Sequence, residues 1–167
     1  MMAKKGFIHA GVLGLVAGGV IGAFFPNQAM GLEPVQAWVS LYNRPGLSLD
    51  MGVSIVADDA GNFYVTGQSE GTGTYRDYNT IKYDSSGNEL WTASYNGPDS
   101  GQDEARAIAI DESSNVYVTG RSQNDSVTIK YDPDGHPLWT ARSDAIDEGS
   151  YIALDGSGNI YVTGFTF

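Results

Sequence analysis

The sequence contains no cysteine among its 167 residues. Disulfide bonds, thiolate metal sites and thiol nucleophiles are therefore excluded. Basic residues are also few, because 9 lysines and arginines stand against 20 aspartates and glutamates, for a net charge of −11. A chain this acidic repels phosphate groups, which argues against nucleic acid and anionic membrane surfaces as partners.

Histidine is scarce as well, and beyond the N-terminal segment only His136 is present. One histidine is too few for most histidine-based metal centres, and no G-x-S-x-G nucleophile motif accompanies it. No segment beyond residue 31 shows the sustained 3.6-residue period of a helix. We therefore expect an all-β fold that is not an enzyme, with no catalytic, cofactor-binding or metal-binding residues.

The long apolar run of the sequence lies at the N-terminus, where Lys4 and Lys5 precede GFIHAGVLGLVAGGVIGAFF and Pro26 follows it. A basic start, an apolar middle and a small-residue exit are typical of a secretory signal peptide. The pattern predicts a signal helix within residues 1–31, cleaved after Gly31, and an exported β region over 32–167.

The alternative is an uncleaved signal anchor, since Phe7 to Phe25 spans 19 residues, close to the roughly 17–25 that cross a bilayer. Only in that case would the membrane be a partner and the chain be anchored to the cell envelope. In both cases we expect the remainder to be exported, to the periplasm or the extracellular space.

One heptapeptide recurs three times, as GNFYVTG at 61–67, SNVYVTG at 114–120 and GNIYVTG at 158–164. A second block at 79–97 matches 127–144, and its tail returns at 37–43 as AWVSLYN. The tryptophans fall 53 and then 48 residues apart, and a period of about 40–50 residues of strand-like units is typical of β-propeller blades. Repetition at this period predicts packing roles, not ligand stacking, for the recurring aromatic residues: Trp38, Trp91, Trp139, Tyr64, Tyr117 and Tyr161.

Each complete unit is expected to form a blade of four short antiparallel strands rich in Val, Ile, Tyr, Thr and Trp. The expected strands are 53–57, 62–67, 78–83 and 90–95 in one unit, and 106–110, 115–120, 126–131 and 138–142 in the next. The complete units cover about 50–96 and 103–142, and partial units cover 37–43 and 147–167. The sequence thus predicts an incomplete arc of about two and a half to three blades.

The connections are of two kinds, which must lie at opposite ends of an up-and-down sheet. Turns such as DDAGN, DSSGN and DPDGH are tight, with an Asp that can bind its own turn backbone and a Gly in the left-handed region. The connections between strands two and three and between units are expected to be long and variable, which is where function usually resides. The surface residues expected at this long-loop end are Arg44, Arg76, Asp77, Asp103, Glu104, Arg121, Asn124, Asp125 and Glu148.

These motifs resemble the bacterial SBBP-type β-propeller repeats, which read approximately AIAVDSSGNVYVTG … DYATIKYDSNGNQLWVARYNG. The resemblance extends over nearly all of 37–167 and implies a secreted propeller from a family whose members mostly lack an assigned activity. The string KYDSSGNELW is also similar to the tryptophan-docking repeats of quinoprotein propellers, but no cofactor-clamping cysteine pair accompanies it. That similarity supports the fold and not the cofactor.

The third copy of the heptapeptide begins a unit that is not finished within these residues, whereas propellers typically have about four to eight blades. The chain is expected either to be a fragment of a longer propeller or to complete its ring with other copies. Self-association would cover apolar faces such as those of Ile81 and Tyr83, and the unpaired strand at 160–167.

The aspartate-rich turns also raise calcium as a weaker alternative to a cofactor-free protein. DPDGH begins like an EF-hand loop, but a ligand position and the closing Glu are missing. Asp50, Asp103 and Asp147 align at the start of each first strand and are expected to form a solvated acidic rim, not a metal site.

The sequence therefore predicts a secreted, non-enzymatic propeller segment that acts as a binding or structural scaffold through its long-loop end, for a protein or glycan partner. The alternatives are part of an extracellular propeller enzyme, a hydrolase or quinoprotein-like protein whose catalytic blades lie outside this chain, and an envelope-anchored interaction module.

Overall fold

The computed structural model describes residues 19–25, 35–42, 49–70, 75–98 and 100–166 of the chain. These residues form twelve strands, and every pairing between them is antiparallel. The strands are β1 (Gly19–Phe25), β2 (Val35–Tyr42), β3 (Asp50–Ala57), β4 (Phe63–Glu70), β5 (Arg76–Tyr83), β6 (Glu89–Tyr95), β7 (Asp103–Ile110), β8 (Val116–Ser122), β9 (Asp125–Tyr131), β10 (Pro137–Ser143), β11 (Glu148–Leu154) and β12 (Ile160–Phe165).

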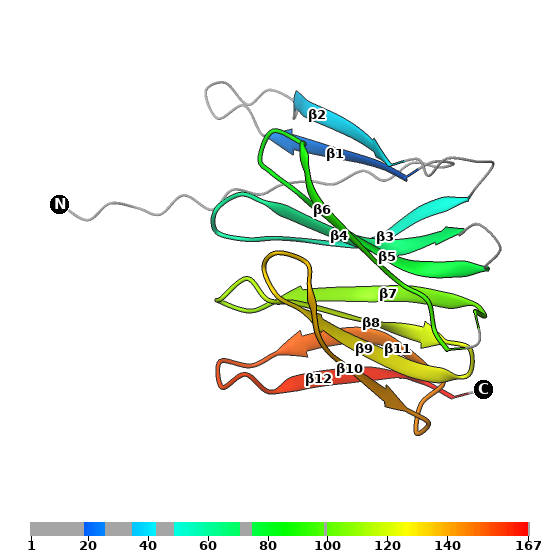
Figure 1. The fold of residues 1–167 in the computed structure, drawn as a ribbon. Helices are drawn as coiled ribbons and strands as arrows, with labels where there is room; N and C mark the ends of the chain where they lie inside the picture. Colours follow the sequence, from blue (N-terminus) through cyan, green and yellow to red (C-terminus); the bar gives the residue numbers. More distant parts are fainter. Residues whose placement is uncertain (1–18, 26–34, 43–48, 71–74, 99, 167) are drawn as a thin grey trace.

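Two complete four-stranded blades form the centre of the fold. One has the order β3-β4-β5-β6 and the other β7-β8-β9-β10, so each strand pairs with its neighbour in sequence. The expected strands are confirmed, although most extend by one to three residues at the long-loop end. The blades lie one after another along an arc, with the two-stranded sheets β1-β2 and β11-β12 at its two ends (Figure 1).

The N-terminal segment differs from the expected signal helix where the structure describes it. Gly19–Phe25 forms a strand that pairs along β2, and residues 1–18 lie outside the described residues. This segment forms a strand because the edge of β2 has backbone N–H and C=O groups that an extended segment can pair with by hydrogen bonds. Among the residues described, no helix is long and apolar enough to span a bilayer. Removal of the segment as a signal peptide stays a prediction.

The core lies between the blades. Tyr64 and Tyr78 of the first blade pack against Val118 and Ile129 of the second, with Trp91 packed at the margin. A single blade has two apolar faces and cannot bury either alone, so stacking of successive blades provides the core.

The face of Ile81 and Tyr83, which we expected to be uncovered, is buried. Ile81 and Tyr83 are 4% and 1% exposed, because Trp38 and Tyr42 of β2 pack over them. Exposed apolar side chains lie at the opposite end of the arc, at Leu138, Trp139, Tyr151, Tyr161 and Phe165, and others lie at Val39, Met51, Val53 and Leu90. The expectation of an open apolar face was therefore wrong for Ile81 and Tyr83 and holds for the last sheet.

The connections at the two ends of the blades differ less in length than the sequence predicted. The tight turns between strands one and two and between three and four lie together at one end. At the other end, β4 and β5 are separated by residues 71–75, but β8 and β9 are joined by Gln123 and Asn124 alone. The second blade closes tightly because its ladder continues to the pair Ser122 and Asp125.

Candidate functional site

The first candidate region is the tight-turn end, where each turn is organised by one aspartate. The Asp111 carboxylate accepts hydrogen bonds from the backbone N–H of Asn115 at 2.9 Å, from the Asn115 side-chain amide at 2.8 Å and from the Tyr117 hydroxyl at 3.0 Å. Partial burial opposes ionisation of Asp111, but these hydrogen bonds outweigh it and lower its pKa. The carboxylate is thus fully used by its own turn.

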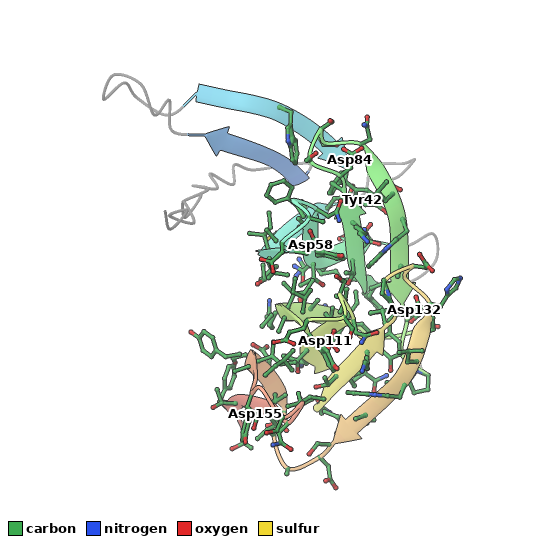
Figure 2. The ribbon with its side chains drawn as sticks, turned by 90° about the vertical axis from the view of Figure 1, so that its left-hand side faces the viewer. Tyr42, Asp58, Asp84, Asp111, Asp132 and Asp155 are labelled. Atoms are coloured by element: carbon green, nitrogen blue, oxygen red, sulfur yellow. The ribbon has the colours of Figure 1, made fainter. Side chains whose placement is uncertain are left out.

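An aspartate also accepts backbone and side-chain hydrogen bonds in the other described turns of this end, although the tyrosine donor is present only in the turns between strands one and two. In the third unit the side-chain and backbone hydrogen bonds from Asn159 lower the pKa of Asp155 to about 2. Hydrogen bonds within the turn also lower the pKa of Asp58, Asp84 and Asp132. Figure 2 shows the five turn aspartates following the arc, three along one row and two along the outer edge. The structural interpretation of the aspartates as turn residues is confirmed by these contacts.

Tyr64 shows how burial and the turn carboxylate change the pKa of a phenol in this arrangement. Burial, together with the hydrogen bond to Asp58 and the charge of that carboxylate, raises the pKa of Tyr64 to about 12. The phenol therefore stays a neutral donor to the turn over the physiological range. Tyr64 and Tyr117 are buried and also donate to their turn aspartates, whereas Tyr161 donates to Asp155 but is 58% exposed.

A left-handed residue closes each tight turn. Gly61, Gly87, Gly135 and Gly158 have φ of 83° to 86°, and Ser114 takes the same place with φ of 60°. The left-handed region favours glycine because a Cβ collides with the backbone there. Ser114 is therefore strained, and its side chain hydrogen-bonds the Tyr64 phenol of the preceding blade.

The tryptophans join successive blades through these glycines. The Trp91 ring lies on Gly135, where an added Cβ would stand 2.7 Å from it, and Trp91 Nε1 donates to the Pro133 carbonyl at 2.9 Å. Trp38 lies on Gly87 in the same way and donates to the Ser85 carbonyl at 3.1 Å. An interblade packing role for the tryptophans is therefore confirmed for Trp38 and Trp91.

The second candidate region is the long-loop end, where four charged side chains cross three sheets. Arg76 of β5 pairs with Glu104 of β7 at 2.9 Å. Arg106 of β7 pairs with Glu104 at 2.6 Å and with Glu148 of β11 at 3.0 Å. The two glutamates are nearly buried and the two arginines are about a third exposed. This chain of ion pairs, which we call the charge ladder, links β5 of the first blade to the first strands β7 and β11 of the following two sheets.

Two of the three acidic residues expected to form a solvated rim, Asp50 and Asp103, are buried, and Asp147 is partly buried. Asp103 is fully buried, and its Oδ2 accepts the backbone N–H of Gly97 at 2.7 Å. Asp50 is 4% exposed and accepts from the Ser69 hydroxyl at 2.5 Å. The expectation of a rim was wrong because the ends of these strands are covered by the neighbouring blade and by the connecting loop.

The structure places the predicted loop-end residues as follows. Four that we expected at the surface are buried, because they hold the charge ladder or the blade ends: Asp77, Asp103, Glu104 and Glu148. Arg76 and Arg121 are half-buried, Asp125 pairs with Arg142, and Asn124 is exposed. Arg44 lies outside the described residues.

Sequence reasoning missed the most exposed aromatic side chain of this end. Tyr75 follows the connection between β4 and β5 and is 66% exposed. The sequence does contain a signal for Tyr75. It is an aromatic residue in a Gly- and Thr-rich connection, and the corresponding turn of the second blade has no aromatic residue. With Asn124, Tyr75 is a non-recurring group at this end that is free to contact a partner.

The described residues contain no group of three His, Cys, Asp or Glu side chains placed to hold a metal ion. Most carboxylates near the turns are engaged by backbone N–H groups and by Asn or Tyr side chains. The loop end carries the paired charges of the charge ladder and the exposed side chains of Tyr75 and Asn124.

The fold defines an open β-propeller arc, and comparison with known proteins supports this class. The sequence model of the SBBP β-propeller repeat matches residues 97–126. This match confirms the resemblance seen in the repeats, and these residues are an SBBP-type β-propeller repeat. No curated protein matches the chain.

A solved structure with a similar fold is a protein of unknown function from Bacteroides caccae, at 12% identity and a TM-score of 0.54. The alignment covers 87% of this chain and 48% of that one, so the chain spans about half the length of its structural neighbour. At this identity the likeness concerns the fold alone.

Proposed function

We propose that this protein is an exported, non-enzymatic propeller scaffold that contacts a protein or glycan partner through its long-loop end. The observation that supports the proposal is that the recurring residues are engaged in structural contacts, whereas the exposed residues of the long-loop end do not recur. Recurring Asp, Gly, Trp and Tyr residues are engaged in the turns and between the blades, whereas Tyr75 and Asn124 are exposed, non-recurring and located on loops.

A tyrosine exposed at a loop end is well suited to this role. Its ring offers a large rigid contact area and its hydroxyl offers a hydrogen bond, which is why tyrosine is enriched in binding surfaces. The next residue, Arg76, begins the charge ladder, whose ion pairs join β5 to β7 and β7 to β11. The proposal includes no cofactor, and its exported location rests on the signal-peptide pattern predicted within residues 1–31.

The test is co-sedimentation of the protein with cell-envelope fractions and with insoluble polysaccharides. We expect Tyr75→Ala combined with Asn124→Ala to weaken retention about tenfold, the effect of losing about 1.4 kcal/mol at a contact. Glu112→Ala, at an exposed position on the opposite end, is the matched control and should bind like the unaltered chain.

Equal retention of the two variants would show that the loop end is not the contact surface. Turnover of any member of a glycoside, ester and alcohol substrate panel by this chain alone would contradict the non-enzymatic part of the proposal.

A further inference from the structure

The sheet β11-β12 is the first half of a blade. β12 repeats the heptapeptide of β4 and β8, and β11 carries the register shift seen in the first strands of both complete blades. The two strands thus correspond to strands one and two. Among the described residues, the other edge of β12 has no neighbouring strand.

The sheet β1-β2 is the second half of a blade. In both complete blades the tryptophan of strand four pairs with a lysine of strand three, Trp91 with Lys82 and Trp139 with Lys130. The register between the two strands shifts directly next to this pair. In β1-β2, Trp38 faces Ala23 and the ladder shifts at the next residue.

The neighbours of β1 agree with this assignment. β1 contacts β3 of the following blade, as β5 contacts β7. Its position in the arc is therefore that of a third strand, with the edge opposite β2 turned toward the place of a second strand.

The aromatic contacts show the same two halves. In each complete blade the tyrosine of strand two packs on the tryptophan of strand four with 6.1 Å between ring centroids, as Tyr64 does with Trp91 and Tyr117 with Trp139. Tyr161 has the tyrosine position but is 58% exposed. Trp38 has the tryptophan position, and its ring contacts are with Phe63 and Tyr83 of the following blade.

We propose that two copies of this chain close one propeller ring, in which β12 of each copy pairs with β1 of the other. Each junction is a four-stranded blade of order β11-β12-β1-β2, and Tyr161 of one copy packs against Trp38 of the other. The ring has six blades, two complete blades from each copy and two shared blades.

A second copy fits this junction better than the same copy. The half-blades lie at opposite ends of the arc (Figure 1), and joining them within one chain would give three blades, below the about four to eight of known propellers. Two copies related by a two-fold rotation close without leaving an open edge.

The closed ring requires that Gly19–Phe25 stay in the working protein, whereas cleavage after Gly31 would remove β1. The mature N-terminus therefore tests the proposal directly. Mass spectrometry of the protein exported by a bacterial host should find β1 present, and a mature chain that begins at Leu32 would overturn the proposal.

The sharper test is a disulfide across the junction, in a chain without other cysteines. Thr66 and Thr80 face each other across strands two and three with 3.0 Å between their hydroxyl oxygens, and Thr119 and Thr128 do so at 2.9 Å. Carried over to the shared blade, this register places Thr163 opposite Ile21. Thr163→Cys combined with Ile21→Cys should therefore form a covalent dimer under mild oxidation.

The matched control is Thr66→Cys combined with Ile21→Cys, because Thr66 has the same place in a blade whose third strand is already present. We expect no crosslink from this pair, and sedimentation of the unaltered chain should give twice the mass of one copy. A folded monomer, a crosslink within one chain, or a reading frame that continues with a third strand after β12 would each overturn the proposal.

Discussion

Glycine at the end of each heptapeptide shows how one residue determines the path of two strands. A Cβ added at Gly120 would lie 2.1 Å from the carbonyl oxygen of Glu104 and 2.9 Å from Cα of Ala105. The same clash is present at Gly67 with Met51 and at Gly164 with Glu148. The first strand shifts register at this point and brings its backbone onto the glycine, so no side chain can be accommodated.

We predict that Gly120→Ala lowers the free energy of unfolding by roughly 2–4 kcal/mol, because backbone must move to relieve the overlap. Gly156→Ala is the control, since an added Cβ there meets no atom within 4 Å; its effect should stay within about 0.5 kcal/mol. Urea unfolding followed by circular dichroism measures both. Equal midpoints for the two variants would contradict the close approach of the strands.

At the scale of the element, the turn between strands three and four receives the tryptophan of the preceding blade. Gly135 and Gly158 have nearly equal positive φ, of 86° and 83°. They differ in their surroundings, because Gly135 lies under Trp91 whereas no atom lies within 4 Å of a Cβ at Gly158. The pair therefore separates the cost of backbone conformation from the cost of losing the interblade contact.

We expect Gly158→Ala to cost about 1–2 kcal/mol, the usual penalty for a Cβ in the left-handed region. Gly135→Ala should cost a further 1–3 kcal/mol or so, because the methyl group displaces the Trp91 ring. Thermal unfolding of the two variants gives the difference, and a red shift of the tryptophan emission should accompany Gly135→Ala only. Identical stabilities would show that tryptophan docking contributes little.

At the scale of the whole molecule, five turn carboxylates make stability depend on pH. Their pKa values are lowered in the fold, with Asp155 lowered to about 2. A lowered pKa means that the stabilisation is present above the unfolded value of 3.8 and is lost as the pH falls through the folded value. The chain should therefore lose stability progressively between about pH 4 and pH 2.

The variant Asp111→Asn tests this dependence. An amide cannot accept all four hydrogen bonds that the Asp111 carboxylate accepts, one of which comes from the Ser113 backbone N–H, so the variant should lose about 1–3 kcal/mol at pH 7. It should lose less than the unaltered chain when the pH is lowered from 4 to 2. Urea midpoints across this range measure the effect, with Glu112→Gln as the control on the same end, and parallel curves for Asp111→Asn and the unaltered chain would contradict it.

The repeats allowed the fold to be predicted closely. Heptapeptide spacing, tryptophan period and turn chemistry are local signals, and together they identified four-stranded blades and the roles of Asp111, Gly135 and Trp91. Such predictions succeed because β-turns and strand alternation depend on residues close together in the sequence.

The loop end was predicted less well, because burial there depends on which blade covers which strand. Glu104 and Glu148 have the composition of surface residues, yet they are buried and paired with Arg106 across a blade boundary. The segment Gly19–Phe25 has the composition of a signal peptide, yet it forms a strand beside β2. The sequence by itself thus determined the blade and its turns, since these are set by local backbone chemistry. Only the tertiary structure decided which charges are buried and which strands form half-blades, because both depend on contacts between residues that are distant in the chain.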